Sequence, residues 1–333
     1  MGEGCWLFRV ASDPKWGGGH VSRCRVLARE LARHGSCVTF WLDPEDGGWT
    51  QSLRGEGFDV VCAPDGAIGL EWNGTLVDGY DLLDAATLNQ MRDIARPLVC
   101  LEDHMTAQID VDLTINAGGE PVDSKGTRVL SGFRYALVEP SFKSVASVSN
   151  PEVDGLLVVM GRTDACGASI QVVRALSSGE FSESPPALTV VLGSTSQILD
   201  DVRHALASYT GQSELLVDVP DMAVLYKQVD AVIVSGGVSL LECLAAGRPS
   251  CVVQTADNQA GNVRQALSSG GTIDGGNIAS WDESKFIEAI RLLCSSAPTR
   301  RGLVTKARRA VDGKGAERVV QAMTQFHQSL SLQ

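Results

Sequence analysis

Short apolar runs alternate with amphipathic helical stretches along the whole chain. Residues 5–10 predict a strand, and residues 21–34 have helical spacing, with Leu27 and Leu31 on one face and Gly35 at the expected C-cap. Further strands, most of them separated by a helix or a long loop, are predicted at residues 36–42, 58–63, 75–77, 98–101 and 111–115. This alternation is typical of βαβ units in a parallel, doubly wound sheet.

The same pattern restarts in the second half of the chain. Residues 156–160 form an unbroken apolar run, and the strands predicted after it lie at residues 187–192, 214–217, 231–234 and 251–254. The polar, Ser-rich stretch 143–150 precedes Pro151 and predicts a linker. We therefore predict an α/β protein of two Rossmann-like domains, residues 1–148 and 149–333, that face each other across a cleft. The last helices could pack back on the first domain.

Composition and charge narrow the classes of function. The chain has 333 residues, enough for two domains. It holds 28 Lys and Arg against 40 Asp and Glu, and the net charge of −12 disfavours nucleic acid as a partner. No apolar run approaches the ~18 residues of a membrane span, and the N-terminal stretch lacks a secretory pattern. We therefore expect a cytoplasmic protein without a membrane partner. Two halves that share one cleft favour a monomer.

Cysteine and histidine spacing predicts neither a disulfide framework nor a metal site. The nine cysteines are scattered with no C-x-x-C pair, several of them in apolar strand-like runs, which predicts reduced buried thiols. There is no H-E-x-x-H motif, and the D-x-D at residues 110–112 leads into a strand rather than leaving one. G-x-G-x-x-G, P-loop and G-x-S-x-G motifs are also absent from the sequence. This disfavours a dehydrogenase, a kinase and a serine hydrolase, and we predict no cofactor.

The first glycine-rich loop is a candidate catalytic site. Gly17, Gly18 and Gly19 stand between a predicted strand and a predicted helix, and His20 follows them. Glycines there let the backbone approach a ligand closely, and the helix start carries a partial positive charge. A histidine at the carboxyl end of such a sheet is well placed to act as a general base. The alternative is a turn histidine that merely caps the helix.

A second candidate follows the strand predicted at residues 231–234. Gly236, Gly237, Val238 and Ser239 would present backbone amides to phosphate at the start of a helix. Glu242 lies one turn further on, where its carboxylate could accept two ribose hydroxyls. The alternative for Glu242 is an ordinary exposed helix glutamate.

Other candidate residues stand where predicted strands end. Asp78 and Tyr80 flank a glycine after the strand at residues 75–77, although an ordinary β-to-α turn could also have this sequence. Residues 101–103 (Leu-Glu-Asp) end another strand with carboxylates. The remaining candidates, for an anionic leaving group or for sugar hydroxyls, are Gly161, Arg162, Asn258 and Gln259.

Taken in order, these motifs resemble those of a known protein family. An N-terminal signature R-x-D-x-x-x-x-x-G-x-G-H-x-x-R aligns with the residues Arg9, Gly17, Gly19, His20 and Arg23. The chain resembles the nucleotide-sugar hydrolases of pseudaminic acid biosynthesis, which remove UDP from UDP-2,4-diacetamido-2,4,6-trideoxy-β-L-altropyranose. That family includes spore-coat polysaccharide proteins and has the GT-B fold. The chain departs from its pattern at two positions, Ala11 in place of the signature aspartate and Arg162 in place of a glycine.

The resemblance implies a mechanism without a metal. UDP would bind the second half, with Glu242 on the ribose and with Asn258 and Gln259 near the sugar or diphosphate. His20 would act as the general base on a water that attacks the anomeric carbon with inversion, and Tyr80 would hold the sugar or the water. Two other functions stay open, namely an inverting UDP-sugar glycosyltransferase of the same fold and a nucleotide-sugar binding protein without catalysis. The peptidoglycan UDP-N-acetylglucosamine transferase has similar loops and is the second family to consider.

Overall fold

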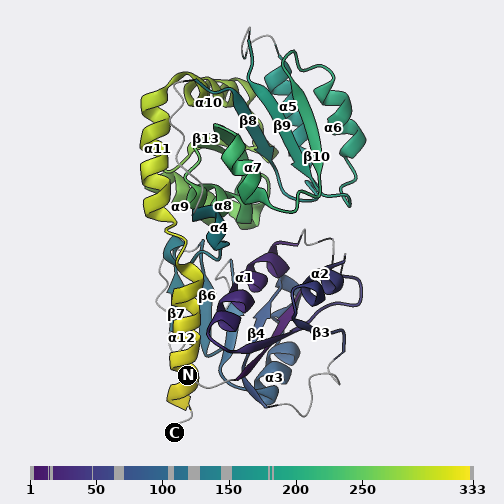
Figure 1. The fold of residues 1–333 in the computed structure, drawn as a ribbon, viewed down its shortest axis with the longest axis vertical. Helices are drawn as coiled ribbons and strands as arrows, with labels where there is room; N and C mark the ends of the chain where they lie inside the picture. The colour runs from purple at the N-terminus through teal and green to yellow at the C-terminus, as the bar shows by residue number, and fades with distance from the viewer. Residues whose placement is uncertain are drawn as a thin grey trace. The chain divides into compact units, whose positions relative to one another are not determined.

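The computed structural model divides the chain into two compact units (Figure 1). Unit 1 comprises Met1–Val138 and Lys314–Gln333, and unit 2 comprises Glu139–Gly313. The structure describes residues 4–13, 15, 18–46, 48–63, 71–103, 109–118, 128–143, 152–178, 181 and 184–330.

Unit 1 is built on a sheet of seven parallel strands in the order β3-β2-β1-β4-β5-β6-β7. The strands are β1 (Cys5–Val10), β2 (Cys37–Trp41), β3 (Asp59–Val61), β4 (Trp72–Asp78), β5 (Leu98–Leu101), β6 (Leu113–Asn116) and β7 (Arg128–Ser131). From β1 the sheet grows on one side through β2 to β3. The chain then returns to the other side of β1, where β4 pairs with it and β5, β6 and β7 follow. The strand order therefore reverses between β1 and β4, and such a switch point is where open α/β sheets bind ligands.

Helices cover both faces of this sheet, which explains the continuous apolar runs of its strands. They are α1 (Gly19–Arg33), α2 (Trp49–Gly55), α3 (Ala85–Ile94), α12 (Gly315–Leu330) and the short 3₁₀ helices η3 (Tyr80–Leu82) and η4 (Phe133–Tyr135). Leu27 of α1 and Met323 of α12 belong to the core on one face, together with Phe8 of β1. Met91 of α3 packs with Val77 of β4 on the other.

Unit 2 repeats this plan with six parallel strands in the order β10-β9-β8-β11-β12-β13. The strands are β8 (Gly155–Val159), β9 (Ala187–Leu192), β10 (Ser213–Val217), β11 (Ala231–Ser235), β12 (Ser250–Gln254) and β13 (Ile273–Asn277). The helices are α4 (Pro140–Lys143), α5 (Ala168–Ser177), α6 (Leu199–Leu206), α7 (Met222–Gln228), α8 (Val238–Ala246), α9 (Ala260–Ser269), α10 (Glu283–Ser295), α11 (Ala297–Ala310), η5 (Asp257–Gln259) and η6 (Ile278–Ser280). The order again reverses, here between β8 and β11. Each unit is thus a doubly wound, Rossmann-like α/β domain.

The division between the units differs from the boundary predicted at residue 148. That residue falls in 144–150, outside the described residues, and the units divide instead after Val138. The reason is that α4 already packs on unit 2, where the Phe142 ring lies 5.5 Å from the Tyr226 ring. The chain passes back from unit 2 to unit 1 after Gly313, so the last helix belongs to unit 1 while α10 and α11 belong to unit 2.

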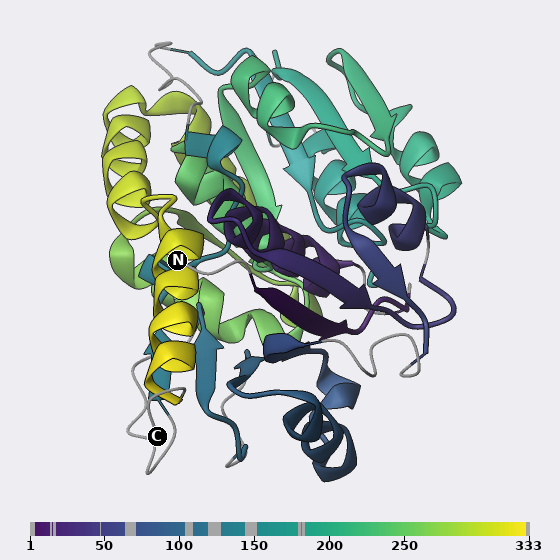
Figure 2. The same ribbon diagram turned by 60° about the horizontal axis from the view of Figure 1, so that its bottom comes forward.

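The returning helix α12 completes one face of unit 1. It packs against α1 and η4. The ribbon views show α12, in yellow, beside α1, in purple (Figures 1 and 2). Gly315 lies so close to the backbone of Ala136 that no side chain would fit there. Arg318 donates to the carbonyl oxygen of Arg134 at 2.8 Å. Of the predicted last helices, α12 is the one that packs back on the first unit.

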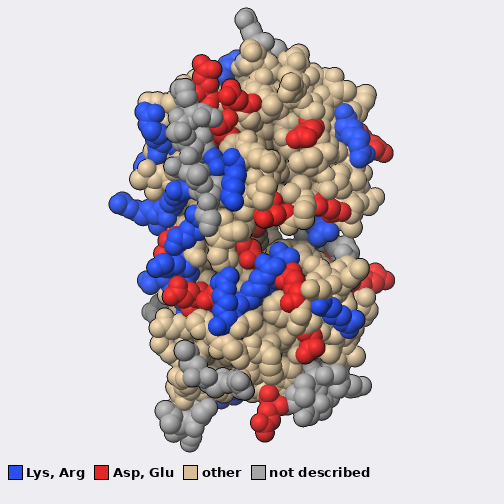
Figure 3. Space-filling model, viewed as in Figure 1, with Lys and Arg blue, Asp and Glu red and all other residues tan. Residues whose placement is uncertain are grey.

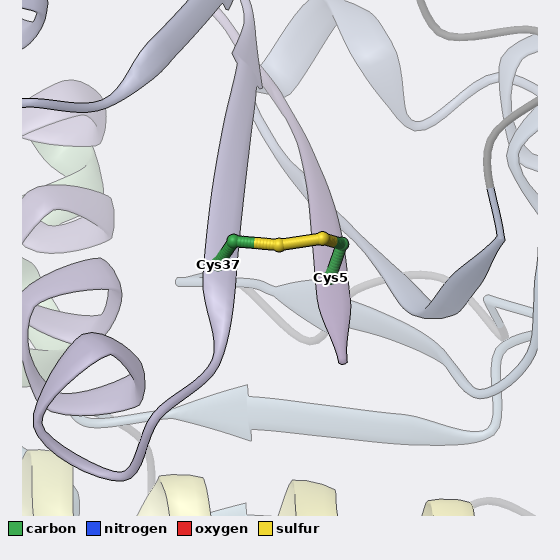
Figure 4. Close-up of a disulfide and its surroundings, with 2 residues drawn as sticks. All are labelled: Cys5 and Cys37. Carbon is green, nitrogen blue, oxygen red and sulfur yellow. A yellow bond between two sulfur atoms is a disulfide. The ribbon is translucent and has the colours of Figure 1, made fainter. Parts of the chain in front are cut away.

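The prediction that every cysteine is a reduced thiol is wrong at two positions. Cys5 and Cys37 are register partners on the adjacent strands β1 and β2, with Cα atoms 4.5 Å apart, and a disulfide joins them (Figure 4). The two lie 32 residues apart in the sequence, across α1, so their spacing gave no signal. The other seven, Cys24, Cys62, Cys100, Cys166, Cys243, Cys251 and Cys294, are free.

Charge is mixed rather than segregated on the face drawn in Figure 3. Acidic and basic side chains are interspersed there on both units, so the net charge of −12 does not form one acidic field on that face. In the part of the chain that the structure describes, every helix is too short or too polar to cross a membrane.

Candidate functional site

The glycine-rich loop of unit 1 leads to the switch point between β1 and β4. Helix α1 begins at Gly19, with Gly18 as its N-cap, and His20 lies in the first turn. Gly18 has φ +81°, and a Cβ there would lie 2.9 Å from the ring of Trp49, so both backbone and packing require glycine. Gly17 lies outside the described residues.

His20 forms a buried pair with Asp78, the last residue of β4. The His20 Nδ1 atom lies 2.7 Å from Asp78 Oδ1, and the two side chains are 5% and 0% exposed. An ionised carboxylate can only accept, so Nδ1 carries the proton and donates it to Asp78. In the neutral ring, Nε2 then carries the lone pair that a general base requires.

Arg23, one turn further along α1, keeps Asp78 ionised. Its Nε and Nη2 atoms both donate to the Asp78 carboxylate at 2.6 Å, and the buried thiol of Cys24 donates to Asp78 Oδ2 at 3.3 Å. Burial alone would raise the pKa of Asp78, but the adjacent Arg23 guanidinium and the His20 ring outweigh burial and hold that pKa well below its usual range. Asp78 is therefore a fully hydrogen-bonded carboxylate that fixes the His20 ring.

Asp103 and Tyr80 extend this network. The Arg23 Nη1 atom donates to Asp103 Oδ1 at 2.7 Å, and the Tyr80 hydroxyl donates to Asp103 Oδ2 at 2.8 Å. The Tyr80 ring meets the His20 ring edge to face, with centroids 4.8 Å apart and planes at 77°. The predicted residues His20, Arg23, Asp78 and Tyr80 thus lie in one cluster, and we call these four with Asp103 the His20 network.

The first residues after β1 are held by a side chain that no sequence motif indicates. Asp43, two residues beyond β2, accepts from the backbone N–H of Ser12 at 2.7 Å and from Arg9 Nη2 at 2.7 Å. Ala11, where the resembling family has an aspartate, is buried against Gly79. Asp43 therefore supplies the carboxylate that holds Ser12 and Asp13, and its position just after a predicted strand was the available signal.

In unit 2, the loop that joins β11 to α8 is held by side-chain hydrogen bonds. The Gln259 Oε1 atom accepts from the Gly236 N–H at 3.1 Å and from the Thr255 N–H at 2.9 Å, while Asn262 Nδ2 donates to the Gly236 carbonyl at 3.0 Å. Gly236 has no room for a side chain beside Val263. Gln259 therefore holds the shape of this loop, and its predicted contact with the ligand stays a prediction.

The start of α8 offers backbone amides to an anion. Its N-cap is Gly237, and no side chain of the described residues caps it, nor does its first turn hold an acidic residue. By contrast, Asp221 and Asp282 cap α7 and α10. Val238, Ser239 and Glu242 are half-buried along the first turns of α8, and Asn258 lies in η5.

The loop after β8 carries Gly161 and Arg162, which the sequence predicts to bind an anionic leaving group. The buried Asp164 carboxylate accepts from the N–H groups of Ala168 and Ser169 at 2.9 and 2.7 Å, so the chain's own carboxylate occupies the start of α5. Arg162 pairs with Asp218 at 3.4 Å on the surface. A role for Gly161 and Arg162 in binding an anion stays a prediction.

Comparison with solved structures defines the class of fold. MurG of Acinetobacter baumannii superposes with a TM-score of 0.67 at 15% identity, covering 97% of this chain and 100% of MurG. The glycosyltransferase VinC, solved in complex with dTDP, superposes with a TM-score of 0.65 at 12% identity, covering 98% of this chain and 100% of VinC. The chain has the GT-B fold of these proteins.

Comparison of sequences gives a relative with a descriptive name. The spore coat polysaccharide biosynthesis protein SpsG of Bacillus subtilis is 28% identical over 204 residues, which is 61% of this chain and 60% of SpsG. No family model matches the sequence. The chain is therefore similar to a polysaccharide biosynthesis protein over less than two thirds of that protein's length.

Proposed function

We propose that the chain is a metal-independent nucleotide-sugar hydrolase that releases UDP from a UDP-linked 2,4-diacetamido-trideoxy sugar in nonulosonic acid biosynthesis. The His20–Asp78 pair carries this proposal, because it holds a histidine with its Nε2 lone pair available at the switch point of unit 1. The GT-B fold and the similarity to a polysaccharide biosynthesis protein support a nucleotide-sugar substrate.

In this reaction His20 Nε2 takes a proton from a water molecule as the water oxygen attacks the anomeric carbon. The bond between that carbon and the diphosphate oxygen breaks, and its electron pair leaves with UDP. The imidazolium that forms lies next to the Asp78 carboxylate, which stabilises it and keeps the ring in place. Attack opposite the departing diphosphate inverts the anomeric configuration.

We assign UDP to unit 2. The amides of Val238 and Ser239 at the start of α8 would bind the diphosphate, and the helix dipole would stabilise its charge as the bond breaks. Glu242 would accept the ribose hydroxyls, and Asn258 would contact the sugar or diphosphate. Gln259 would contact the sugar or diphosphate as well, and it also holds the loop that carries Gly236 and Gly237.

A second candidate replaces water by an acceptor hydroxyl, which makes the protein an inverting glycosyltransferase. The observation that favours it is the named glycosyltransferase VinC among its structural neighbours. The same His20 network would serve, because an alcohol also has to lose its proton as it attacks.

Product analysis separates these functions. The protein is incubated with UDP-2,4-diacetamido-trideoxy-hexose and with UDP-N-acetylglucosamine, and the products are followed by NMR. We expect equal amounts of UDP and free sugar, with the sugar first appearing as the inverted anomer. Turnover only with an added acceptor would assign a transferase, and UDP binding without turnover of any sugar nucleotide would refute both enzymes.

Glu242→Ala tests the assignment of UDP to α8. The variant loses hydrogen bonds to a charged acceptor, each worth about 1.5–3 kcal/mol. UDP affinity should therefore fall and KM should rise, with little change in kcat, because the contact is equal in ground and transition states. Calorimetric titration of UDP measures the change. Unchanged affinity in the folded variant would mean that the nucleotide does not lie on this helix.

Treatment with EDTA is expected to leave the rate unchanged. The carboxylates Asp78 and Asp103 are engaged by Arg23, and among the described residues no group of three His, Cys, Asp or Glu is arranged to hold a metal ion. Initial rates before and after chelation provide the measurement. Loss of activity that Mg²⁺ or Mn²⁺ restores would contradict leaving-group stabilisation by backbone amides alone.

A further inference from the structure

The carboxylate of Asp103 fixes the direction of a hydrogen bond at the catalytic base. Asp103 Oδ1 accepts from Arg23 Nη1 at 2.7 Å, and Arg23 also pairs with Asp78. Asp103 Oδ2 accepts from the Tyr80 hydroxyl at 2.8 Å. A phenol has one proton, so a Tyr80 hydroxyl that donates to Asp103 can only accept from any further partner.

Two neighbouring groups of the His20 network therefore present acceptors. His20 gives its Nδ1 proton to Asp78 and keeps a lone pair on Nε2, and Tyr80 gives its proton to Asp103 and keeps its oxygen lone pairs. The two rings are in contact, with centroids 4.8 Å apart. A nucleophile beside both rings meets two acceptors and no donor from this pair.

Water matches this arrangement better than an alcohol does. Water has two O–H bonds, so a water molecule that reaches both groups can donate one to His20 Nε2 and the other to the Tyr80 oxygen while a lone pair points at the anomeric carbon. An alcohol has a single O–H bond and leaves one acceptor unmatched, which costs part of the hydrogen-bond energy.

We propose that Asp103 is a positioning residue that, by holding Tyr80 as an acceptor beside His20, makes the site select water over alcohols as the nucleophile. This inference rests on the proposed function. The step is the one given above: one water proton moves to His20 Nε2, the water oxygen bonds to the anomeric carbon, and the diphosphate leaves with the electron pair. The second water proton stays on the product hydroxyl.

The partition between water and methanol tests the proposal. Turnover is run in aqueous methanol, and free sugar and methyl glycoside are quantified by NMR. In wild type we expect free sugar to exceed methyl glycoside by more than the molar ratio of the two nucleophiles. Tyr80→Phe removes the second acceptor, and Asp103→Asn removes the carboxylate that fixes it, so each should raise the glycoside-to-sugar ratio by about 3- to 10-fold, the value of one hydrogen bond.

A double variant shows whether Asp103 acts through Tyr80. In the Tyr80→Phe background, Asp103→Asn should change the partition ratio no further, because residues that act as one unit are not additive. Tyr209→Phe and Asp84→Asn are the matched controls. Tyr209 donates to the Pro186 carbonyl in unit 2, and Asp84 caps α3 at the surface, so both should keep the wild-type ratio.

The outcomes separate this inference from the proposed function. An unchanged ratio in both Tyr80→Phe and Asp103→Asn, with His20→Asn inactive, would overturn the role of Asp103 and leave the general base standing. Additive effects of the two substitutions would likewise refute action through Tyr80. A wild type that forms glycoside in proportion to methanol would overturn selection of water, and an active His20→Asn variant would overturn the proposed function itself.

Discussion

Replacement of His20 by asparagine is expected to lower kcat by about 100-fold or more, since a positioned general base contributes ~10²–10⁴ in rate. Asparagine can still donate to Asp78, so the buried carboxylate keeps a partner, but it offers no basic nitrogen to the nucleophile. The UDP contacts are proposed to lie in unit 2, so UDP affinity should stay within a few-fold of wild type. Steady-state rates and calorimetric titration with UDP measure the two quantities.

His34→Asn is the matched control for that variant. His34 follows the same helix at its other end, where its side chain is 41% exposed beside Glu30. This substitution should leave both rate and affinity unchanged. A His20→Asn variant that retained more than about a tenth of the wild-type rate would show that another group removes the proton.

Strand prediction worked where burial on both faces leaves a continuous apolar run. Residues 5–10 were predicted and form β1, and residues 187–192 form β9. Two edge strands were missed. β7 is short, partly polar and only partly buried. β13 contains Gly275 and Gly276, which weaken the strand pattern in its sequence. Both are strands because a neighbouring strand pairs with them, which local sequence does not reveal.

The candidate site likewise contains residues that the sequence predicts and contacts that it does not. His20, Asp78 and Tyr80 follow from the rule that ligand-facing residues stand at the carboxyl ends of parallel strands. The cross-links do not follow from that rule, because the bonds of Arg23 to Asp103 and of Arg9 to Asp43 depend on side-chain direction over tens of residues of sequence separation. The disulfide between Cys5 and Cys37 likewise depends on strand register.

The second large effect is expected from Asp78→Asn, which should lower the free energy of unfolding by about 3–5 kcal/mol at pH 7. The amide has one oxygen and an N–H₂ group, so it cannot accept from His20, both Arg23 nitrogens and Cys24. The largely buried Arg23 charge then keeps Asp103 as its remaining carboxylate in the network. The same change frees the His20 ring and should lower kcat by a factor comparable to loss of the base itself.

The pH dependence of this stability difference follows from the lowered pKa of Asp78. A carboxylate whose pKa is depressed on folding contributes its full stabilisation above its unfolded pKa, near 3.9, and loses it as the pH falls towards the folded value. The gap between wild type and Asp78→Asn should therefore be constant from pH 7 to about 5 and shrink below about pH 4, as urea denaturation at each pH would measure. Asp84→Asn, an exposed helix cap that asparagine also fills, should stay within about 0.5 kcal/mol of wild type at pH 7. A loss below about 1 kcal/mol for Asp78→Asn at pH 7 would mean that Arg23 and His20 are stable without this carboxylate, and the arrangement proposed for the base would then be wrong.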